Sequence, residues 1–317
     1  MAFQKYQKPQ YPVRQWLLEG PAKSGKSTFI TQLRTPLLPI DADHRFAEVA
    51  DLVPDGNILQ LSNVPADHVN PDRIAELLRQ NMPGSQVGTI VVDSLSPIIV
   101  PLIMKAFRDN DQGKNTNKVA AYSEKATAVR LLQDSVTGWG SDVAWIYHTF
   151  EGRDNKAKVE VKTSLPELEI ARVLRSCNMR LRFSNEGNVY KVRVVWARRG
   201  RSGVELADDT GCWKDMPERI EAAVYDGLSE TEMDTIEGQA PDMFPSPAEA
   251  IRWGMDQDGV FRDEAHAQNA YDLVKDAKQP TDARQMRDLW VAEVEARRND
   301  ESTVSEAERQ AVREADS

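Results

Sequence analysis

Two glycines, a lysine and a hydroxyl residue stand at fixed spacing in a short segment near the start of the sequence. Residues 20–28 read GPAKSGKST, and residues 20–27 fit the pattern G-x-x-x-x-G-K-[ST]. In this pattern, main-chain N–H groups surround a nucleotide β-phosphate, the lysine contacts the β- and γ-phosphate oxygens, and the hydroxyl ligates Mg²⁺. Lys26 and Ser27 take the last two roles. The other residues expected to line the phosphate site are Gly20, Pro21, Ala22, Lys23, Ser24, Gly25 and Thr28.

The flanking sequence favours a phosphate loop over an ordinary glycine turn that caps a helix. The apolar run QWLL precedes the segment, and the amphipathic run FITQL follows it. A strand–loop–helix order directs the positive end of the helix at the phosphates. The charge of Lys23 either contacts phosphate or remains in solvent.

A second candidate metal-binding residue follows another apolar run. The stretch VGTIVVDSLSP leads into Asp93. An aspartate at the carboxyl edge of a neighbouring strand holds the Mg²⁺ of a phosphate-loop enzyme. ATP and Mg²⁺ are therefore the expected cofactors, with Ser27 and Asp93 at the metal.

Up to about residue 228, apolar runs of strand length alternate with amphipathic segments of helix length, which is typical of a layered α/β domain. The expected strands are residues 15–19, 37–41, 57–62, 89–94 and 143–149, and the expected helices are residues 26–35, 71–81 and 117–137. Residues 178–185 and 189–197 then alternate about EGN, which predicts a hairpin. The fold class is therefore α/β, with a mostly parallel sheet that ends in an antiparallel hairpin.

The amino-acid composition divides the remainder of the chain into three segments. Residues 229–246 are acidic and contain Pro and Gly, which predicts a linker after a domain of residues 1–228. Residues 247–298 have helical periodicity and an N-capping serine, which predicts a small helical module. Residues 299–317 are a charged tail, either helical or disordered. The tail is a candidate binding segment for a partner protein.

The charge is unevenly distributed. The net charge is −10, yet nine basic residues between positions 171 and 201 are accompanied by a single acid, Glu186. The two cysteines exclude a disulfide framework, and no apolar run reaches the length of a membrane span. With no apolar stretch at the N-terminus, the sequence predicts a cytoplasmic protein without a membrane partner.

The strand after the first helix adds a family resemblance. Residues 36–49 read PLLPIDADHRFAEV, with Asp41 and Asp43 after the apolar run. With the phosphate loop, this stretch resembles the RecA-type recombinases, especially the archaeal and eukaryotic branch. In that branch the corresponding strand ends in an Asp-Thr-Glu-Gly-type motif whose glutamate activates water. The resemblance implies a RecA-like phosphate-loop core over roughly residues 14–215, with Asp43 in the place of that glutamate.

Three further matches follow in the same order along the chain. TIVVDSLSPII is similar to the Asp-Ser strand of the family, and VAWIYHT to the strand that ends in a polar γ-phosphate sensor, here His148. YKVRVVWARRGRSG is similar to the late hairpin whose basic residues reach a neighbouring subunit's nucleotide, which implies that Arg198 and Arg199 act in trans.

Two of these assignments have simpler alternatives. Asp43 can be a helix-capping or loop acid, and His148 can be a polar residue at a strand end. Aspartate is one methylene shorter than glutamate, so slow turnover is expected. Histidine also titrates near neutral pH.

The early position of the loop is similar to the layout of core-only recombinase-like ATPases of tailed phages, which promote annealing or pairing of single-stranded DNA. The resemblance implies an ATP-hydrolysing protein that forms a ring or filament, binds single-stranded DNA and assists phage-type recombination or annealing. A replication helicase or loader is one alternative. A regulatory nucleotide-binding module without DNA activity is another.

In the recombinase fold, DNA lies against two loops, which correspond here to residues 108–125 and 151–166. Basic side chains there would neutralise phosphates without reading bases, although nearby acids weaken the field. Tyr122 and Phe150 are candidates for stacking on bases, or for packing in the core. The basic residues considered for this role are Lys114, Lys118, Lys125, Arg153, Lys156, Lys158 and Lys162.

Overall fold

The computed structural model describes residues 9–111, 118–153, 159–187 and 189–229, then 232, 236, 240–241, 243–244, 246–257 and 260–298. Its contacts divide the chain into two units. The first unit is Met1–Pro166 with Val173–Met233, and the second is Glu167–Arg172 with Asp234–Ser317. The predicted domain limits at residues 228, 246 and 298 stay a prediction.

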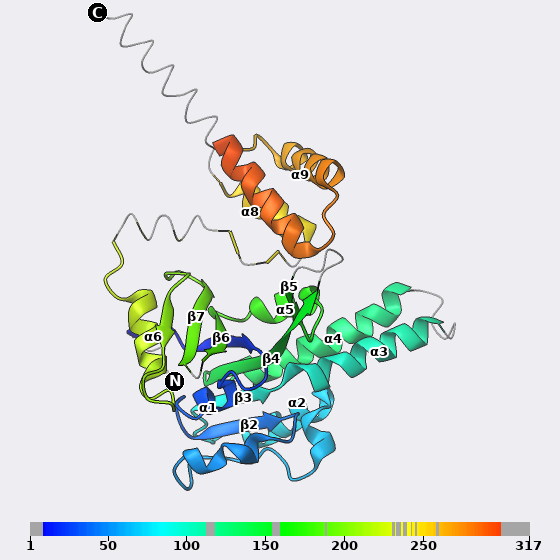
Figure 1. The fold of residues 1–317 in the computed structure, drawn as a ribbon. Helices are drawn as coiled ribbons and strands as arrows, with labels where there is room; N and C mark the ends of the chain where they lie inside the picture. Colours follow the sequence, from blue (N-terminus) through cyan, green and yellow to red (C-terminus); the bar gives the residue numbers. More distant parts are fainter. Residues whose placement is uncertain are drawn as a thin grey trace, which may run out of the picture. The chain divides into compact units, whose positions relative to one another are not determined.

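The first unit is built on a mostly parallel sheet with the order β2-β3-β4-β1-β6-β7-β8 (Figure 1). Strands β2, β3, β4, β1 and β6 run parallel, whereas β7 pairs antiparallel with β6, and β8 pairs antiparallel with β7. The predicted fold class, a mostly parallel α/β sheet that ends in an antiparallel hairpin, is confirmed. The strands are β1 (Gln15–Gly20), β2 (Leu37–Asp41), β3 (Thr89–Asp93), β4 (Asp142–Arg153), β5 (Val159–Thr163), β6 (Met179–Glu186), β7 (Val189–Ala197) and β8 (Glu205–Ala207).

Successive side chains of the central strands point to opposite faces of the sheet, and both faces are buried. Trp16 and Leu18 of β1 join a core with Phe29 of α1 and Ile220 of α6. Leu17 and Glu19 occupy the opposite face of the same strand and are also buried. Burial of both faces is typical of a parallel sheet covered by helices. The helices of this unit are α1 (Lys26–Ile30), α2 (Pro71–Asn81), α3 (Leu95–Asp111), α4 (Lys118–Thr137) and α6 (Met216–Tyr225), and most of α5 (Glu167–Leu174) belongs to the second unit.

Local sequence explains where α2 begins. Pro71 occupies the first helical position, where its missing N–H is not needed. The Asn70 side chain accepts hydrogen bonds from the main-chain N–H groups of Asp72 and Arg73. Ile74 and Leu78 then recur on the buried face of the helix, which packs against α4.

Several predicted elements differ from the structure. The expected strand at residues 57–62 is absent from the described residues, where Ile58 forms only an isolated bridge with Leu37. Helix α1 ends at Ile30, five residues before its predicted end at residue 35. The helix α3 was not predicted at all, because its start, LSPIIVPLIM, is a continuous apolar run without helical alternation.

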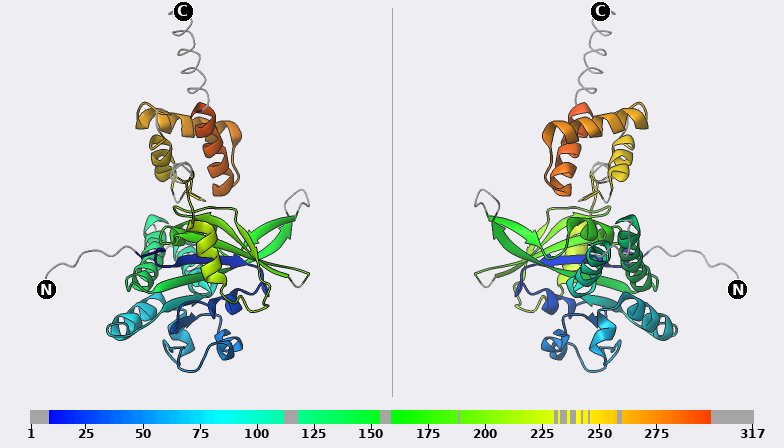
Figure 2. Two further views of the ribbon diagram at one scale, coloured as in Figure 1. Left: turned by 90° about the vertical axis from the view of Figure 1, so that its left-hand side faces the viewer. Right: turned by 90° about the vertical axis from the view of Figure 1, so that its right-hand side faces the viewer.

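The two predicted DNA-facing loops are mostly regular structure. α3 extends to Asp111 and α4 begins at Lys118, so most of residues 108–125 is helical. β4 continues to Arg153 and pairs antiparallel with β5, so residues 151–153 and 159–163 belong to the two strands of a β-hairpin (Figure 2). Lys114, Lys156 and Lys158 lie outside the described residues.

The second unit has its own helical core. It contains α8 (Pro247–Met255), α9 (Glu264–Lys278) and a further helical stretch over residues 283–298. Ser246 accepts a hydrogen bond from Glu249 N, as its predicted capping role requires. Trp290 is fully buried in this core and donates to Ala250 O at 2.8 Å. Among the described residues, no helix has the length and apolarity needed to cross a membrane.

Candidate functional site: the phosphate loop and a carboxylate–imidazole cluster

The phosphate-loop motif lies between β1 and α1, at the carboxyl edge of the sheet. Gly25 has φ 85°, and a Cβ there would come within 2.7 Å of Trp213 Nε1. A Cβ on Gly20 would lie 2.5 Å from Phe183 O. Glycine is therefore needed at both motif positions for packing of the loop, as well as for approach of its N–H groups to a ligand.

Lys26 points into its own loop. Its ammonium donates to Gly20 O at 2.7 Å and Pro21 O at 2.8 Å, and it contacts Ser24 Oγ at 3.3 Å. Burial lowers the pKa of Lys26 to about 8, although the Asp93 and Asp43 carboxylates act to raise it. Two main-chain carbonyl oxygens thus hold the ammonium at the position where the motif predicts phosphate oxygens.

Ser27 and Asp93 are directly linked. Ser27 Oγ donates to Asp93 Oδ2 at 3.1 Å, which joins the loop to the end of β3. Burial, followed by the charge of Asp43, raises the pKa of Asp93 to about 6, and the bond from Ser27 opposes the rise. A hydroxyl and a carboxylate oxygen are ligands that suit Mg²⁺, so the predicted metal pair fits the ion chemically.

Asp43 and His148 meet beside this pair. His148 Nε2 lies 3.2 Å from Asp43 Oδ2, and this hydrogen bond is the largest cause of the lowered pKa of Asp43. The main-chain N–H groups of Ala42 and Asp43 donate to Asp93 O at 2.7 and 3.1 Å. Ligand atoms of Asp43, Asp93 and His148 all lie within 4.8 Å of one another. Asp43 follows the end of β2, Asp93 ends β3, and His148 lies within β4 level with Gly20, so three adjacent strands bring the three residues together.

The neighbouring acid Asp41 has a structural role. Its carboxylate accepts from Arg45 N at 2.9 Å and Phe46 N at 3.1 Å, and so caps the short helical turn that follows. Of the two acids after β2, only Asp43 belongs to the cluster.

Arg198 and Arg199 lie at the amino edge of the sheet, opposite the phosphate loop. Arg198 N donates to Asn178 O, and Asn178 N donates to Gln15 O, at the amino end of β1. The Arg198 guanidinium donates to Arg175 O at 2.9 Å. Neither arginine is part of the cluster in its own chain, and action on a neighbouring subunit's nucleotide stays a prediction.

Trp213 is a contact of the phosphate loop that the sequence did not reveal. Its indole Nε1 donates to Gly25 O at 3.0 Å, and its main-chain N donates to Asp208 Oδ2. The ring is buried and also contacts Tyr190. The only local signal is the turn-rich stretch DDTGCWKD, which does not predict its position against a loop 188 residues away.

Trp213→Phe is expected to weaken ATP binding severalfold and to lower the free energy of unfolding by about 0.5–1.5 kcal/mol, because Gly25 O loses its indole donor and keeps only the hydrogen bond from Phe29 N. Isothermal titration with a non-hydrolysable ATP analogue and urea unfolding measure the two effects. Trp139→Phe is the matched control, since its indole donates to Ser135 O away from the loop. The control should lose stability and keep its ATP affinity; equal affinity losses in both variants would contradict the role of Trp213.

A buried charged network lies directly before the loop. The Glu19 carboxylate accepts from Arg180 and Arg182, each at 2.6 Å, and from the Tyr147 hydroxyl. Glu19 precedes Gly20, and Tyr147 precedes His148. The network therefore ties the end of β1, which carries the phosphate loop, to the part of β4 that carries His148. In the sequence, the signal for this network was the charged residue Glu19 at the end of the apolar run QWLLE.

Asp93→Asn is expected to stabilise the nucleotide-free chain by about 1–2 kcal/mol at pH 7. The raised pKa, about 6, means that the folded chain holds the Asp93 proton more tightly than the unfolded chain does. Ionisation therefore costs folding free energy that is fully present above about pH 6 and disappears below about pH 4. Urea unfolding at pH 4 and 7 measures the gain, with exposed Asp276→Asn as control. An unchanged or lower stability at pH 7 would show that the Asp93 charge is compensated.

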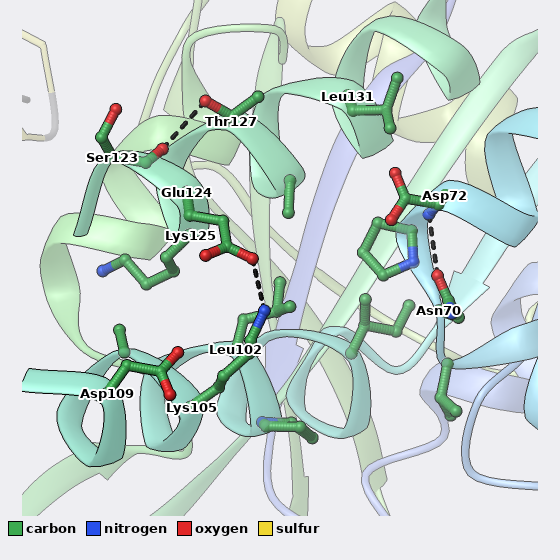
Figure 3. Close-up of a pocket in the computed structure, with 16 residues that line it drawn as sticks. Asn70, Asp72, Leu102, Lys105, Asp109, Ser123, Glu124, Lys125, Thr127 and Leu131 are labelled. Atoms are coloured by element: carbon green, nitrogen blue, oxygen red, sulfur yellow. Dashed lines mark hydrogen bonds and ion pairs between the residues drawn. The ribbon is translucent and has the colours of Figure 1, made fainter. Parts of the chain in front are cut away.

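A separate cavity of about 560 Å³ lies between α2, α3 and α4 (Figure 3). Lys105 of α3 and Glu124 of α4 form an ion pair in its wall. No residue of the phosphate loop and no member of the carboxylate–imidazole cluster lines it. The cavity is therefore not the site of the predicted chemistry.

No family model and no curated protein matches the sequence. Among solved structures, the chain is similar to a RadB recombinase, with 13% identity, 62% of this chain and 87% of that chain covered, and a TM-score of 0.34. It is also similar to a KaiC-like protein from the hyperthermophilic archaeon Pyrococcus horikoshii, with 12% identity, 61% and 83% covered, and a TM-score of 0.38. Similarity at this level does not assign the chain to a family.

Proposed function

We propose that the chain is a Mg²⁺-dependent ATPase with a RecA-like core. The observation that carries the proposal is the meeting of the phosphate loop, through Ser27, with Asp93, and of Asp93 with Asp43 and His148. The loop follows β1, Asp43 follows β2 and Asp93 ends β3, and His148 lies within β4 level with Gly20, so all of them meet at the carboxyl edge of β1, β2 and β3. Ligands bind at this carboxyl edge in open α/β sheets.

Each side chain has a role that its contacts support. Lys26 would exchange the loop carbonyls for β- and γ-phosphate oxygens, and Ser27 with Asp93 would hold Mg²⁺, which supplies charge neutralisation at the phosphates. Asp43 would orient the attacking water. Its lowered pKa keeps it ionised at neutral pH, and His148, which forms a hydrogen bond with its carboxylate, would contact the γ-phosphate.

We further propose that the protein binds single-stranded DNA and assists phage-type recombination or annealing, as a ring or filament in which Arg198 and Arg199 contact a neighbour's nucleotide. The β4–β5 hairpin offers the supporting surface. Phe150 is 51% exposed, and its cross-strand neighbour Lys162 is also exposed. An aromatic ring beside a lysine suits base stacking and phosphate contact.

The helical part of the predicted DNA surface is less suitable. Lys125 is 8% exposed, and its ammonium lies 5.5 Å from the centre of the Tyr122 ring. Both residues therefore contribute to packing around α4 in the isolated chain. The DNA proposal rests on the hairpin instead.

Phe150→Ala is expected to weaken binding of a fluorescent oligonucleotide by about 5- to 100-fold, because stacking contributes about 1–3 kcal/mol per base. Fluorescence anisotropy at several salt concentrations measures it, and ATP hydrolysis with and without the oligonucleotide tests coupling. Leu273→Ala, at an apolar residue 66% exposed on α9, is the control. ATP hydrolysis without any DNA binding would favour a regulatory module, and fuelled strand unwinding would favour a helicase.

A further inference from the structure

The carboxylate–imidazole cluster is a mixed nitrogen–oxygen donor set. Asp43 Oδ2 and His148 Nε2 are 3.2 Å apart, and no pair of ligand atoms in the cluster is separated by more than 4.8 Å. A six-coordinate divalent ion with bonds of about 2.1 Å spaces adjacent ligand atoms by about 3.0 Å and opposite ones by about 4.2 Å. Sub-ångström side-chain movements would therefore close the three groups around one ion.

The cluster also concentrates negative charge. Asp43 and Asp93 place two carboxylates together, and Asp93 is 5% exposed. The charge of Lys26 acts on both carboxylates, but its ammonium donates to the loop acceptors. Within the described part of the chain, neither carboxylate has an ion pair with lysine or arginine. A divalent cation would neutralise both carboxylates at once.

The positions of the donors are fixed by the sheet. β3 lies between β2 and β4, and main-chain hydrogen bonds from Ala42 and Asp43 to Asp93 O hold the two acids at a constant separation. Ser27 Oγ, 3.1 Å from Asp93 Oδ2, adds a hydroxyl oxygen to the set. Such preorganisation reduces the cost of gathering ligands around an ion.

The environment of the imidazole does not oppose metal binding. His148 Nδ1 is buried, with no hydrogen-bond partner among the described residues. If Nε2 carries the proton and donates to Asp43, Nδ1 is an unpaired acceptor. If Nε2 binds a metal, Nδ1 is an unpaired donor. Nδ1 is unsatisfied in both cases, so replacing the Nε2 proton by a metal does not add the cost of another unsatisfied buried atom.

We propose that Asp43, Asp93 and His148 bind one divalent transition-metal ion directly and without nucleotide, with Ser27 as an additional oxygen ligand. Carboxylates suit Mg²⁺ and Mn²⁺ alike, whereas imidazole suits transition metals, so the nitrogen ligand favours Mn²⁺ over Mg²⁺. The inference deepens the proposed function and rests on it for the role of this site, but the binding itself requires no ATP.

The test is a Mn²⁺ titration of the full-length chain without nucleotide, in which electron paramagnetic resonance reports free Mn²⁺. One site is expected, occupied in the presence of a tenfold excess of Mg²⁺, and pulsed measurements should show coupling to an imidazole nitrogen. His148→Gln should weaken Mn²⁺ binding by tenfold or more. The matched control is His44→Asn, which removes an exposed imidazole one residue beyond Asp43 and should leave the affinity unchanged.

Lys26→Ala separates this inference from the proposed ATPase. The variant should lose ATP affinity and keep its Mn²⁺ site, because Lys26 contacts none of the three ligands directly. The inference is overturned if the wild-type chain binds no Mn²⁺ without nucleotide, shows no nitrogen coupling, or binds Mn²⁺ equally well with His148→Gln. Magnesium-dependent ATP hydrolysis by the same preparation would leave the proposed function standing. His148-dependent Mn²⁺ binding in a chain that neither binds nor hydrolyses ATP would support the metal site and contradict the proposed function.

Discussion

Lys26→Ala is expected to reduce ATP hydrolysis by at least about 10²- to 10³-fold, the usual loss when a preorganised donor to a developing charge is removed. The wild-type ammonium is already held inside the loop by Gly20 O and Pro21 O, so it is in place when phosphate oxygens arrive. Alanine removes both the charge and three N–H donors. Steady-state release of phosphate, with ATP above and below KM, measures the loss.

The control for this variant is Lys278→Ala, which removes an exposed lysine at the end of α9. Its hydrolysis rate should equal that of the wild type. The free energy of unfolding of Lys26→Ala should also change little or increase, because burial lowers the pKa of Lys26 to about 8 and so makes its charge costly in the ligand-free fold. Wild-type turnover by Lys26→Ala would remove the phosphate loop from the proposed mechanism.

Glu19→Ala is expected to lower the free energy of unfolding by about 3–5 kcal/mol, the largest stability effect of any substitution considered. Glu19 and Arg180 are both buried, with side chains 1% and 3% exposed, and the carboxylate is bound by two guanidinium groups and a tyrosine hydroxyl. Its loss leaves Arg180 and Tyr147 without their shared acceptor. Urea unfolding at pH 7 measures the change.

A neighbouring ion pair supplies the control for Glu19. Glu186 pairs with Lys191 on the β6–β7 hairpin at 2.7 Å, but its side chain is 65% exposed. Glu186→Ala should therefore cost less than about 1 kcal/mol. The double variant Glu19→Met with Arg180→Met should recover part of the loss, because it removes two buried charges together. Equal costs for Glu19→Ala and Glu186→Ala would contradict the importance of the buried network.

The local part of this site could be predicted from the sequence. A phosphate loop is a continuous segment, so its glycines, lysine and hydroxyl residue are recognisable by spacing alone. Strands β1 and β3 are apolar runs because both of their faces are buried, and the residue that ends each run, Gly20 or Asp93, lies at the sheet edge. The β6–β7 hairpin was predicted for a similar reason, since strand alternation and its turn residues are adjacent in the chain.

Elements that depend on distant partners were predicted poorly. Residues 57–62 alternate like a strand, yet only Ile58 finds a bridging partner in Leu37. Residues 151–166 look like a polar loop, yet the end of β4 pairs with β5 and makes them a hairpin. The polarity of a segment indicates whether its side chains are exposed to solvent. Whether the segment forms a strand depends on the unpaired main-chain N–H and C=O groups of a partner strand.

The sequence by itself determined a phosphate loop after a buried strand, a mostly parallel α/β sheet, and a short set of polar residues at strand ends. Only the tertiary structure decided which of them meet: Asp43 joins Asp93 and His148, while Asp41 caps a turn and Arg198 lies at the opposite edge. The reason is strand order and direction. β2, β3 and β4 are parallel neighbours, so the ends of β2 and β3 lie beside His148 of β4, whereas β7 runs antiparallel and carries its last residues away from the loop.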